Sequence, residues 1–277
     1  MANFTNKTII ITGASTGIGR ATAIAFHDAG ARLVLAARST DALEQLSTDL
    51  GGPDRALPVT TDVSDPDQCQ ALIDRAVAQF GGIDVLINNA GMVVSGHFEH
   101  LQPGDIEKQF AVNYFGVVYC IRAALPHLKQ SQGVIVNISS VAGFFGTPTA
   151  SAYSATKAAL NSLGQSLRVE LKPYGIGVST VCPYFTSGVQ LAQKGVIREG
   201  SLHKRSLSKS ESKRRKWQSH PPGQQTSEQV ADAIVKAADR RSRLVVLSPV
   251  GRLIWRLNRL APWLVDWVLE RGSNRLQ

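Results

Sequence analysis

The sequence predicts an α/β protein built on one doubly wound, parallel, seven-stranded sheet. Seven short runs of aliphatic and β-branched residues recur along the 277-residue chain. They are apolar throughout rather than alternating, as expected of strands buried on both faces of a parallel sheet. Longer segments with helical periodicity separate them, and a glycine-rich loop joins the first run to the first helix. Strand followed by helix, repeated, indicates parallel pairing with helices on both faces.

The elements are expected in this order along the chain. Strands are expected at KTIIIT (7–12), RLVLAA (32–37), ALPVT (56–60), IDVLIN (83–88), GVIVNIS (133–139), IGVSTVC (176–182) and RLVVLS (243–248). Helices are expected at about 17–29, 40–50, 65–79, 105–130, 152–171 and 227–239. We expect Ser64 to cap the third helix, with Pro66 in its first turn, and Thr226 to begin the sixth.

Length and composition narrow the class of protein. The chain can hold one large domain or two small ones, and its 43% apolar and 18% charged residues are typical of globular proteins. It has no apolar run of roughly 18 residues and no signal-peptide pattern, so we expect a cytoplasmic location. Cys69, Cys120 and Cys182 have neither CxxC nor Cys/His ligand spacing, so we expect reduced core thiols and no metal site.

The positive charge is concentrated in one segment. Residues 194–222 hold nine Lys/Arg residues and two glutamates, and the whole chain has a net charge of +9. Such a segment is most often a solvated surface, but it also fits an anionic substrate or a membrane surface. Trp217 is its only aromatic residue, too few for base stacking, so we expect no nucleic-acid partner.

The glycine-rich loop has the features of a phosphate-binding turn. ITGASTGIGRATA (11–23) follows the first strand and opens the first helix. Its glycines permit a tight turn and a close backbone approach, so that a diphosphate can rest on the free N–H groups of the helix. The Gly-x-x-x-Gly-x-Gly spacing of Gly13, Gly17 and Gly19 differs from the GxGxxG fingerprint and resembles the TGxxxGIG motif of short-chain dehydrogenases/reductases.

This resemblance covers residues 5–182 with its motifs and continues loosely to about 248. It implies a Rossmann-type sheet with strand order 3-2-1-4-5-6-7 and a nicotinamide cofactor. NNAG (88–91) matches the motif that shapes the family's cofactor channel and stabilises its sheet. The resemblance also implies which residues contact the cofactor after the first, third and fourth strands. They are Gly13, Ser15, Thr16, Gly17, Ile18, Gly19, Asp62, Val63, Asn89, Ala90 and Gly91.

The end of the second strand bears on the choice of cofactor. An Asp or Glu there would accept hydrogen bonds from the ribose 2′-hydroxyl of NAD(H). This chain has Arg38 instead, which can pair with a 2′-phosphate, so we expect NADP(H) rather than NAD(H). Thr16 lies where some NADP-dependent relatives carry a second basic residue, so the preference depends on Arg38.

Tyr153 and Lys157 are the candidate catalytic pair. Residues four apart on a helix lie on one face, so both can point into one cleft. Alone, such a pair indicates packing more often than chemistry, but Ser140 lies thirteen residues upstream and Asn113 precedes it. Together Asn113, Ser140, Tyr153 and Lys157 resemble the family's catalytic tetrad; the family's interval to the tyrosine selects Ser140 over Ser139.

The chemistry of carbonyl reduction explains these residue types. The developing alkoxide needs a proton from an acid within hydrogen-bond reach, and Tyr153 is that acid, or the base in oxidation. Free tyrosine has a pKa of about 10, and we expect the Lys157 ammonium to lower it. Lys157 would also hold the nicotinamide ribose, and Ser140 would orient the substrate oxygen. The resemblance implies that Asn113 anchors Lys157 through a water.

The chain departs from the family after its sixth strand. Pro183 fits the usual Pro-Gly pair, but Tyr184 replaces the glycine, and Thr186 is the candidate contact for the nicotinamide amide. The variant resembles hydroxysteroid and retinol dehydrogenases, which implies a hydrophobic substrate. In the family the following residues, here 184–225, form the lid over the substrate.

The C-terminal residues 251–277 predict an amphipathic extension that Pro262 divides into two short helices. Leu253, Ile254, Leu257, Leu260, Leu264 and Val268 share one face of a continuous wheel, and Arg256, Arg259, Asp266 and Glu270 lie opposite. The apolar face can cover the chain's own domain or a partner subunit. Alternatively, residues 251–270 lie in a membrane interface, which suits Trp and Arg.

We therefore expect one catalytic domain, residues 1–250, with a C-terminal extension, residues 251–277. The expected function is NADP(H)-dependent hydride transfer between the nicotinamide and a ketone, aldehyde or secondary alcohol. The resemblance implies a homodimer or homotetramer that assembles through the long central helices. The alternative is a nucleotide-binding scaffold or sensor with weak turnover, whose basic lid binds an acidic partner.

Overall fold

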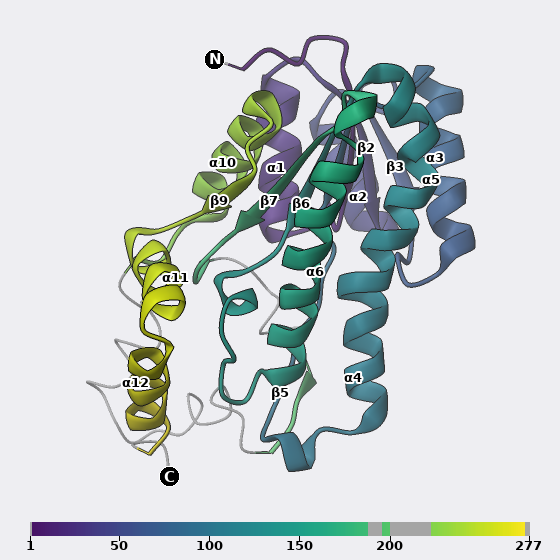
Figure 1. Cartoon of the computed structure of the whole chain (residues 1–277). Coiled ribbons are helices and arrows are strands. Elements are labelled where there is room, and N and C mark those ends of the chain that lie inside the picture. Colours follow the sequence, from purple (N-terminus) through teal and green to yellow (C-terminus); the bar gives the residue numbers. More distant parts are fainter. Residues whose placement is uncertain (1, 188–195, 200–222, 275–277) are drawn as a thin grey trace.

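The computed structural model describes residues 2–187, 196–199 and 223–274 (Figure 1). A seven-stranded sheet forms its centre, in the order β3-β2-β1-β4-β6-β7-β9, and every neighbouring pair is parallel. This confirms the predicted fold class and strand order. The strands are β1 (Thr8–Thr12), β2 (Arg32–Ala37), β3 (Ala56–Thr60), β4 (Val85–Asn88), β6 (Val134–Ile138), β7 (Gly177–Cys182) and β9 (Leu244–Val246).

Helices cover both faces of the sheet, because the side chains of the central strands alternate between two apolar cores. One core joins the sheet to α1 (Gly17–Asp28), α2 (Thr40–Asp49) and α10 (Ser227–Arg240). The other joins it to α3 (Pro66–Phe80), α5 (Gly116–Ser131) and α6 (Ser151–Glu170). In Figure 1, α1 and α10 lie to the left of the strands, and α3 and α5 lie to their right. All three cysteines are free and buried, which confirms the predicted core thiols.

Two helix starts show how the local sequence sets the boundaries. The prediction that Ser64 caps α3 is wrong: Asp65 is the cap, and its carboxylate accepts hydrogen bonds from the N–H groups of Asp67 and Gln68. Aspartate is as good a cap as serine, and here it is the residue directly before Pro66 at the first helical position. Thr226 caps α10 as predicted.

The single helix expected at 105–130 is interrupted. It consists of α4 (Pro103–Phe110), a π-helical turn (Ala111–Phe115) and α5. Asn113 lies in the π-helical turn, where its side chain binds both backbone polar groups of Met92. A π-turn adds one residue to the helix and often occurs at functional sites. Hydrophobic periodicity alone does not reveal it.

Two short strands lie outside the main sheet. β5 (Val94–Ser95) pairs in parallel with β8 (Val196–Ile197), in a part of the chain where no strand was predicted. Most of the basic segment and most of the expected lid, residues 188–195 and 200–222, lie outside the described residues.

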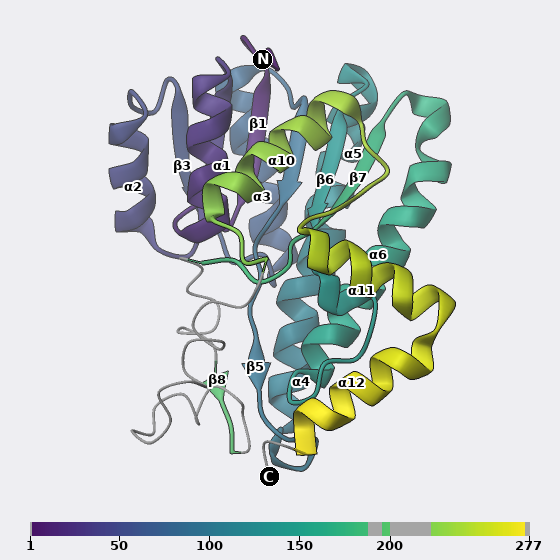
Figure 2. The same ribbon diagram turned by 90° about the vertical axis from the view of Figure 1, so that its left-hand side faces the viewer.

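The C-terminal extension forms α11 (Pro249–Leu260) and α12 (Pro262–Asn274), divided at Pro262 as predicted. Figures 1 and 2 place both helices at one end of the sheet, and α11 contacts Phe144 in the loop between β6 and α6. Leu253, Leu260 and Val268 of the predicted apolar face are exposed, so this part of the face does not cover the chain's own domain. Burial against a partner subunit or in a membrane interface stays a prediction. Within the described part of the chain, no helix is both long and apolar enough to cross a membrane.

Candidate active site

The glycine-rich loop packs directly on the NNAG segment. Gly13 has φ of +66°, and a Cβ there would lie 2.9 Å from the Ala90 Cα and from the Asn89 Nδ2. A Cβ on Gly19 would collide with the Gly13 carbonyl oxygen. Both positions therefore require glycine, the first for its backbone conformation and both for close approach. The predicted loop residues Ser15, Thr16, Gly17 and Ile18 form the turn and the first residues of α1.

Asn89 ties the ends of β1 and β4 together. Its side-chain amide donates to the carbonyl oxygens of Thr12 (2.9 Å) and Gly13 (3.2 Å). The Thr12 hydroxyl in turn accepts the backbone N–H groups of Asn89 and Ala90, both at 3.0 Å. The amide of Asn89 thus holds the glycine loop against the end of β4.

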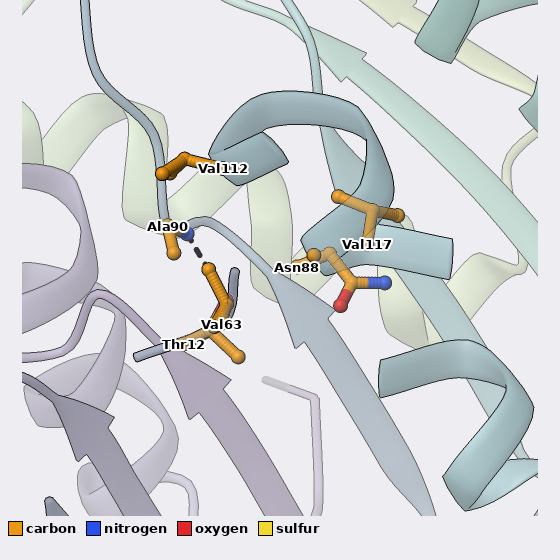
Figure 3. Close-up of a pocket in the computed structure, with 7 residues that line it drawn as sticks. Thr12, Val63, Asn88, Ala90, Val112 and Val117 are labelled. Atoms are coloured by element: carbon orange, nitrogen blue, oxygen red, sulfur yellow. Dashed lines mark hydrogen bonds between the residues drawn. The ribbon is translucent and has the colours of Figure 1, made fainter. Parts of the chain in front are cut away.

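A small pocket lies beside this junction (Figure 3). Its lining comes from the ends of β1 and β4, the loop after β3, and the start of α5: Thr12, Val63, Asn88, Ala90, Val112, Gly116 and Val117. Behind it the Asn88 amide donates to the Asn137 side chain on β6 (2.9 Å). This buried amide pair crosslinks the central strands just below the site.

The first turn of α1 is suited to bind a diphosphate. Thr16 is its N-cap residue, but the Thr16 side chain makes no capping hydrogen bond, so the first N–H groups can donate to an external anion. Arg38 is exposed directly after β2 and lies close enough to Asp62 to affect its ionisation. Burial raises the pKa of Asp62, but hydrogen bonds from Ser64 and the charge of Arg38 outweigh it, and the net shift is downward. These features fit the phosphates and ribose of a dinucleotide.

Lys157 is buried on α6, and its ammonium donates to the Ile138 carbonyl at the end of β6 (2.8 Å). The Nζ lies 5.7 Å from the centre of the Tyr153 ring. A Cβ on Gly91 would lie 3.8 Å from this Nζ and 3.4 Å from the Asn113 Oδ1, so Gly91 faces both side chains. The structure therefore brings Asn113, Tyr153 and Lys157 to one place, beside the NNAG segment.

Asn113 is fully buried, and its side chain is hydrogen-bonded to Thr156 on α6. Its amide donates to the Thr156 hydroxyl (3.1 Å), which donates to the Tyr153 carbonyl (2.7 Å). Asn113 thus connects the π-helical turn, the backbone of Met92 and the first turn of α6. Among the described residues, no direct hydrogen bond joins Asn113 to Lys157. The water-mediated link between these two side chains therefore stays a prediction.

Ser140 begins the turn after β6 and reaches Tyr153. Its hydroxyl accepts the Ala142 N–H (3.1 Å), and Ser140 lies close enough to the Tyr153 hydroxyl to oppose the rise in the pKa of Tyr153. The neighbouring Ser139 points the other way and donates to the Lys157 carbonyl (3.1 Å). The position of Ser140, and not that of Ser139, suits a group that orients a substrate oxygen.

Burial controls the ionisation of the pair. It lowers the pKa of Lys157 to about 8, because the ammonium is costly to desolvate. It also raises the pKa of Tyr153, against the opposing hydrogen bond from Ser140. The expected lowering of the Tyr153 pKa by Lys157 is therefore not found in this chain without its ligands, because desolvation of the phenolate dominates.

Sequence reasoning missed two residues of the site. Cys182 ends β7 near Ser139 and Lys157, and burial raises the pKa of its thiol to about 12, so it is neutral. The Cys182 thiol contacts the Asn161 side chain (3.7 Å), whose amide donates to the Gly143 carbonyl (3.1 Å). Asn161 lies one helical turn beyond Lys157, on the same face of α6 as Tyr153 and Lys157. Its amide holds the turn that begins at Ser140.

The residues after β7 form the other side of the site. Pro183 is buried, and its carbonyl accepts the Val141 N–H next to Ser140 (3.0 Å). The Thr186 hydroxyl donates to the Tyr184 carbonyl (3.2 Å). Tyr184 and Phe185 pack edge to face, and Phe185 is exposed.

The described part of the expected lid is anchored by an ion pair. Arg198 donates two hydrogen bonds to the Asp105 carboxylate on α4, at 2.8 and 2.9 Å. A Cβ on Gly96 would lie 2.6 Å from the Arg198 Cβ, so glycine permits this approach. The Arg198 hydrogen bonds lower the pKa of Asp105.

A glycine-rich turn at the start of α1 and a Tyr-Lys pair on α6, both at the carboxyl ends of a doubly wound sheet, are the arrangement expected of a nicotinamide-dependent oxidoreductase. The chain belongs to the short chain dehydrogenase family, whose profile matches residues 7–197. Over 271 residues it is 35% identical to an 11-beta-hydroxysteroid dehydrogenase 1A of Arabidopsis thaliana, covering 96% of this chain and 75% of the relative.

Solved structures show the same fold. An alcohol dehydrogenase from the archaeon Thermococcus sibiricus, complexed with 5-hydroxy-NADP, aligns with a TM-score of 0.70 and 25% identity, over 83% of this chain and 89% of that one. A 3-ketoacyl-(acyl-carrier-protein) reductase from Brucella melitensis, complexed with NADH, aligns with a TM-score of 0.73 and 25% identity, over 88% and 96%. These two structures thus contain different nicotinamide dinucleotides.

Proposed function

We propose that this protein is an NADP(H)-dependent oxidoreductase that interconverts a hydrophobic ketone or aldehyde and the corresponding alcohol. The observation that carries the proposal is the cluster formed by Ser140, Tyr153 and Lys157: the buried Lys157 ammonium lies 5.7 Å from the centre of the Tyr153 ring, and Ser140 lies near the Tyr153 hydroxyl. A bound nicotinamide supplies or accepts the hydride. The residues of this chain position the substrate and move its proton.

Tyr153 is the proton donor in reduction. Its raised pKa keeps the phenol protonated at neutral pH, as a general acid requires. Ser140 donates to the substrate oxygen and holds it within reach of the Tyr153 hydroxyl. Lys157, with a pKa of about 8, is an ammonium at neutral pH, and this charge stabilises the phenolate left after transfer. Two of its N–H groups remain for the nicotinamide ribose, since one is bound to Ile138.

Arg38 supports the choice of NADP(H). It is exposed at the end of β2, where the guanidinium can form a bidentate pair with a 2′-phosphate. At the nicotinamide end Pro183 and Thr186 would border the amide, and at the adenine end Asp62 and Val63 would flank the ring. The solved relatives contain either 5-hydroxy-NADP or NADH, so the preference rests on Arg38.

The aromatic residues that follow the ends of β6 and β7 support a hydrophobic substrate. Tyr184 and Phe185 follow β7, and Phe144 follows the Ser140 turn and packs against Trp255 of α11 with ring centres 6.1 Å apart. The similarity to a hydroxysteroid dehydrogenase also favours a large apolar alcohol or ketone. We propose steroid-, retinoid- or lipid-like substrates.

The exposed apolar residues of the long helices support assembly into a homodimer or homotetramer. Phe115, at the start of α5, and Val169, near the end of α6, are 45% and 71% exposed. Burial of both against a second copy would remove this apolar surface from water. Light scattering coupled to size exclusion measures the mass; a monomer at micromolar concentration contradicts the proposal.

Turnover with a panel of hydrophobic ketones tests the proposed activity. We expect Tyr153→Phe to lose nearly all NADPH oxidation while still binding NADPH, because only the proton donor is removed. Tyr174→Phe, at an exposed position in the turn after the C-terminal end of α6, is the matched control and should retain the wild-type rate. Equal rates for wild type and Tyr153→Phe would refute the mechanism and favour the scaffold alternative.

A further inference from the structure

α11 and α12, called here the arm, have one side on the catalytic domain and one side in solvent. On the inner side the Asn258 amide donates to the Phe144 carbonyl (2.6 Å), and a Cβ on Gly251 would lie 3.1 Å from Val141. Both contacts reach the turn that begins at Ser140. The inner side therefore packs against the turn that positions Ser140.

The outer side exposes large apolar residues. Leu260 and Trp263, on either side of the bend, are 85% and 69% exposed, and Leu253, Trp267 and Val268 are about half exposed. These residues account for five of the eleven exposed large hydrophobic side chains in the described part of the chain. Such a concentration on two adjoining helices marks an interaction surface rather than scattered surface residues.

Cations accompany this apolar surface. Arg252, Arg256 and Arg259 are exposed on α11, at helical spacing, beside Leu253 and Leu260. On α12 the Arg271 guanidinium lies over the Trp267 ring, 3.8 Å from its centre. α11 contains no acidic residue, and Asp266 and Glu270 lie on α12. Thus α11 contributes the positive charge, and α12 contributes the exposed tryptophans.

We propose that the arm surface binds an anionic lipid bilayer. Tryptophan and leucine enter the headgroup region, and arginine pairs with lipid phosphates. A second copy of the chain fits less well, since a two-fold contact centred on α11 would bring its three arginines against their own counterparts. Because the inner side of the arm touches the Ser140 turn, a bound bilayer lies next to the entrance for a lipid-soluble substrate.

Vesicle flotation of the full chain without substrate or cofactor tests this proposal independently of turnover. We expect binding to vesicles of phosphatidylcholine and phosphatidylglycerol, in a ratio of roughly three to one, that falls with added salt. The triple variant Arg252→Gln, Arg256→Gln and Arg259→Gln should bind roughly a hundredfold more weakly, at about fivefold for each arginine. Its matched control removes three exposed cations from α3 and α10: Arg75→Gln, Lys236→Gln and Arg240→Gln.

The tryptophans provide a second readout. Trp263→Ser with Trp267→Ser should weaken binding by at least about tenfold, whereas Val169→Ser, equally exposed on α6, should not. Wild-type binding in both arm variants would overturn the proposal and assign the membrane contact to another part of the chain. Absence of wild-type binding would also overturn it, and loss of a dimer in the Trp variant would assign the surface to a second copy.

Discussion

The buried Lys157 ammonium makes a quantitative prediction about stability and pH. Burial shifts the pKa of Lys157 from 10.5 to about 8, which corresponds to about 3 kcal/mol of differential interaction between its two protonation states. Above pH 10.5 lysine is neutral in both the folded and the unfolded chain, and folding carries no charge penalty. As pH falls towards 8, only the unfolded chain takes up the proton, so the folded state loses about 3 kcal/mol. Below pH 8 the penalty is constant.

Comparison with Lys157→Met isolates this effect, because all other titrating groups are shared. We expect the free energy of unfolding of wild type, relative to Lys157→Met, to rise by about 3 kcal/mol between pH 7.5 and 10.5. Urea unfolding at several pH values, followed by tryptophan fluorescence, measures it. Lys236→Met, at an exposed site, is the control and should run parallel to wild type. A difference between wild type and Lys157→Met that does not vary with pH would refute the assigned cause, desolvation of the ammonium.

Three further predictions concern the cofactor, the lid segment and the Ser140 turn. Arg38→Gln should lower kcat/KM for NADPH by roughly 10- to 100-fold and leave that for NADH nearly unchanged; an equal loss with both cofactors would contradict the 2′-phosphate contact. Arg198→Gln should speed limited proteolysis of the segment after β7, because the pair with Asp105 anchors it; an unchanged cleavage rate would show that the anchor is dispensable. Asn161→Leu should lower kcat more than it raises KM, since it frees the turn that orients Ser140; a loss of stability with unchanged kinetics would make its role purely structural.

The sequence was sufficient where local residue types decide the structure. Uninterrupted apolar runs required a parallel sheet with covered faces, and the glycines at 13 and 19 indicated backbone positions where a Cβ does not fit. The i, i+4 spacing of Tyr153 and Lys157 was enough to place both on one face of α6. In these places the prediction needed no knowledge of distant contacts.

The sequence was insufficient where a contact joins distant parts of the chain. In the π-helical turn, Asn113 hydrogen-bonds the backbone of Met92, which lies 21 residues earlier in the chain. Helical periodicity does not predict such a distant contact. β5 and β8 are two residues each and lie about one hundred residues apart, so neither has a detectable period. The pairing of Arg198 with Asp105 is equally non-local. These features appear only when the fold is assembled.

The pKa shifts of Tyr153 and Lys157 also depend on the folded structure, and they bear on the mechanism. The spacing of Tyr153 and Lys157 shows that the two side chains are close but not how deeply they are buried. From spacing alone, Lys157 was therefore expected to lower the pKa of Tyr153. In the folded chain burial acts on both groups and favours the neutral form of each, so the phenol stays protonated and the ammonium becomes easier to deprotonate. A protonated phenol suits reduction, in which Tyr153 gives up a proton. Oxidation needs the phenolate, and the positive charge of an oxidised nicotinamide would favour it. We therefore propose that the free chain is prepared as an acid, and that a bound oxidised cofactor would allow Tyr153 to act as a base.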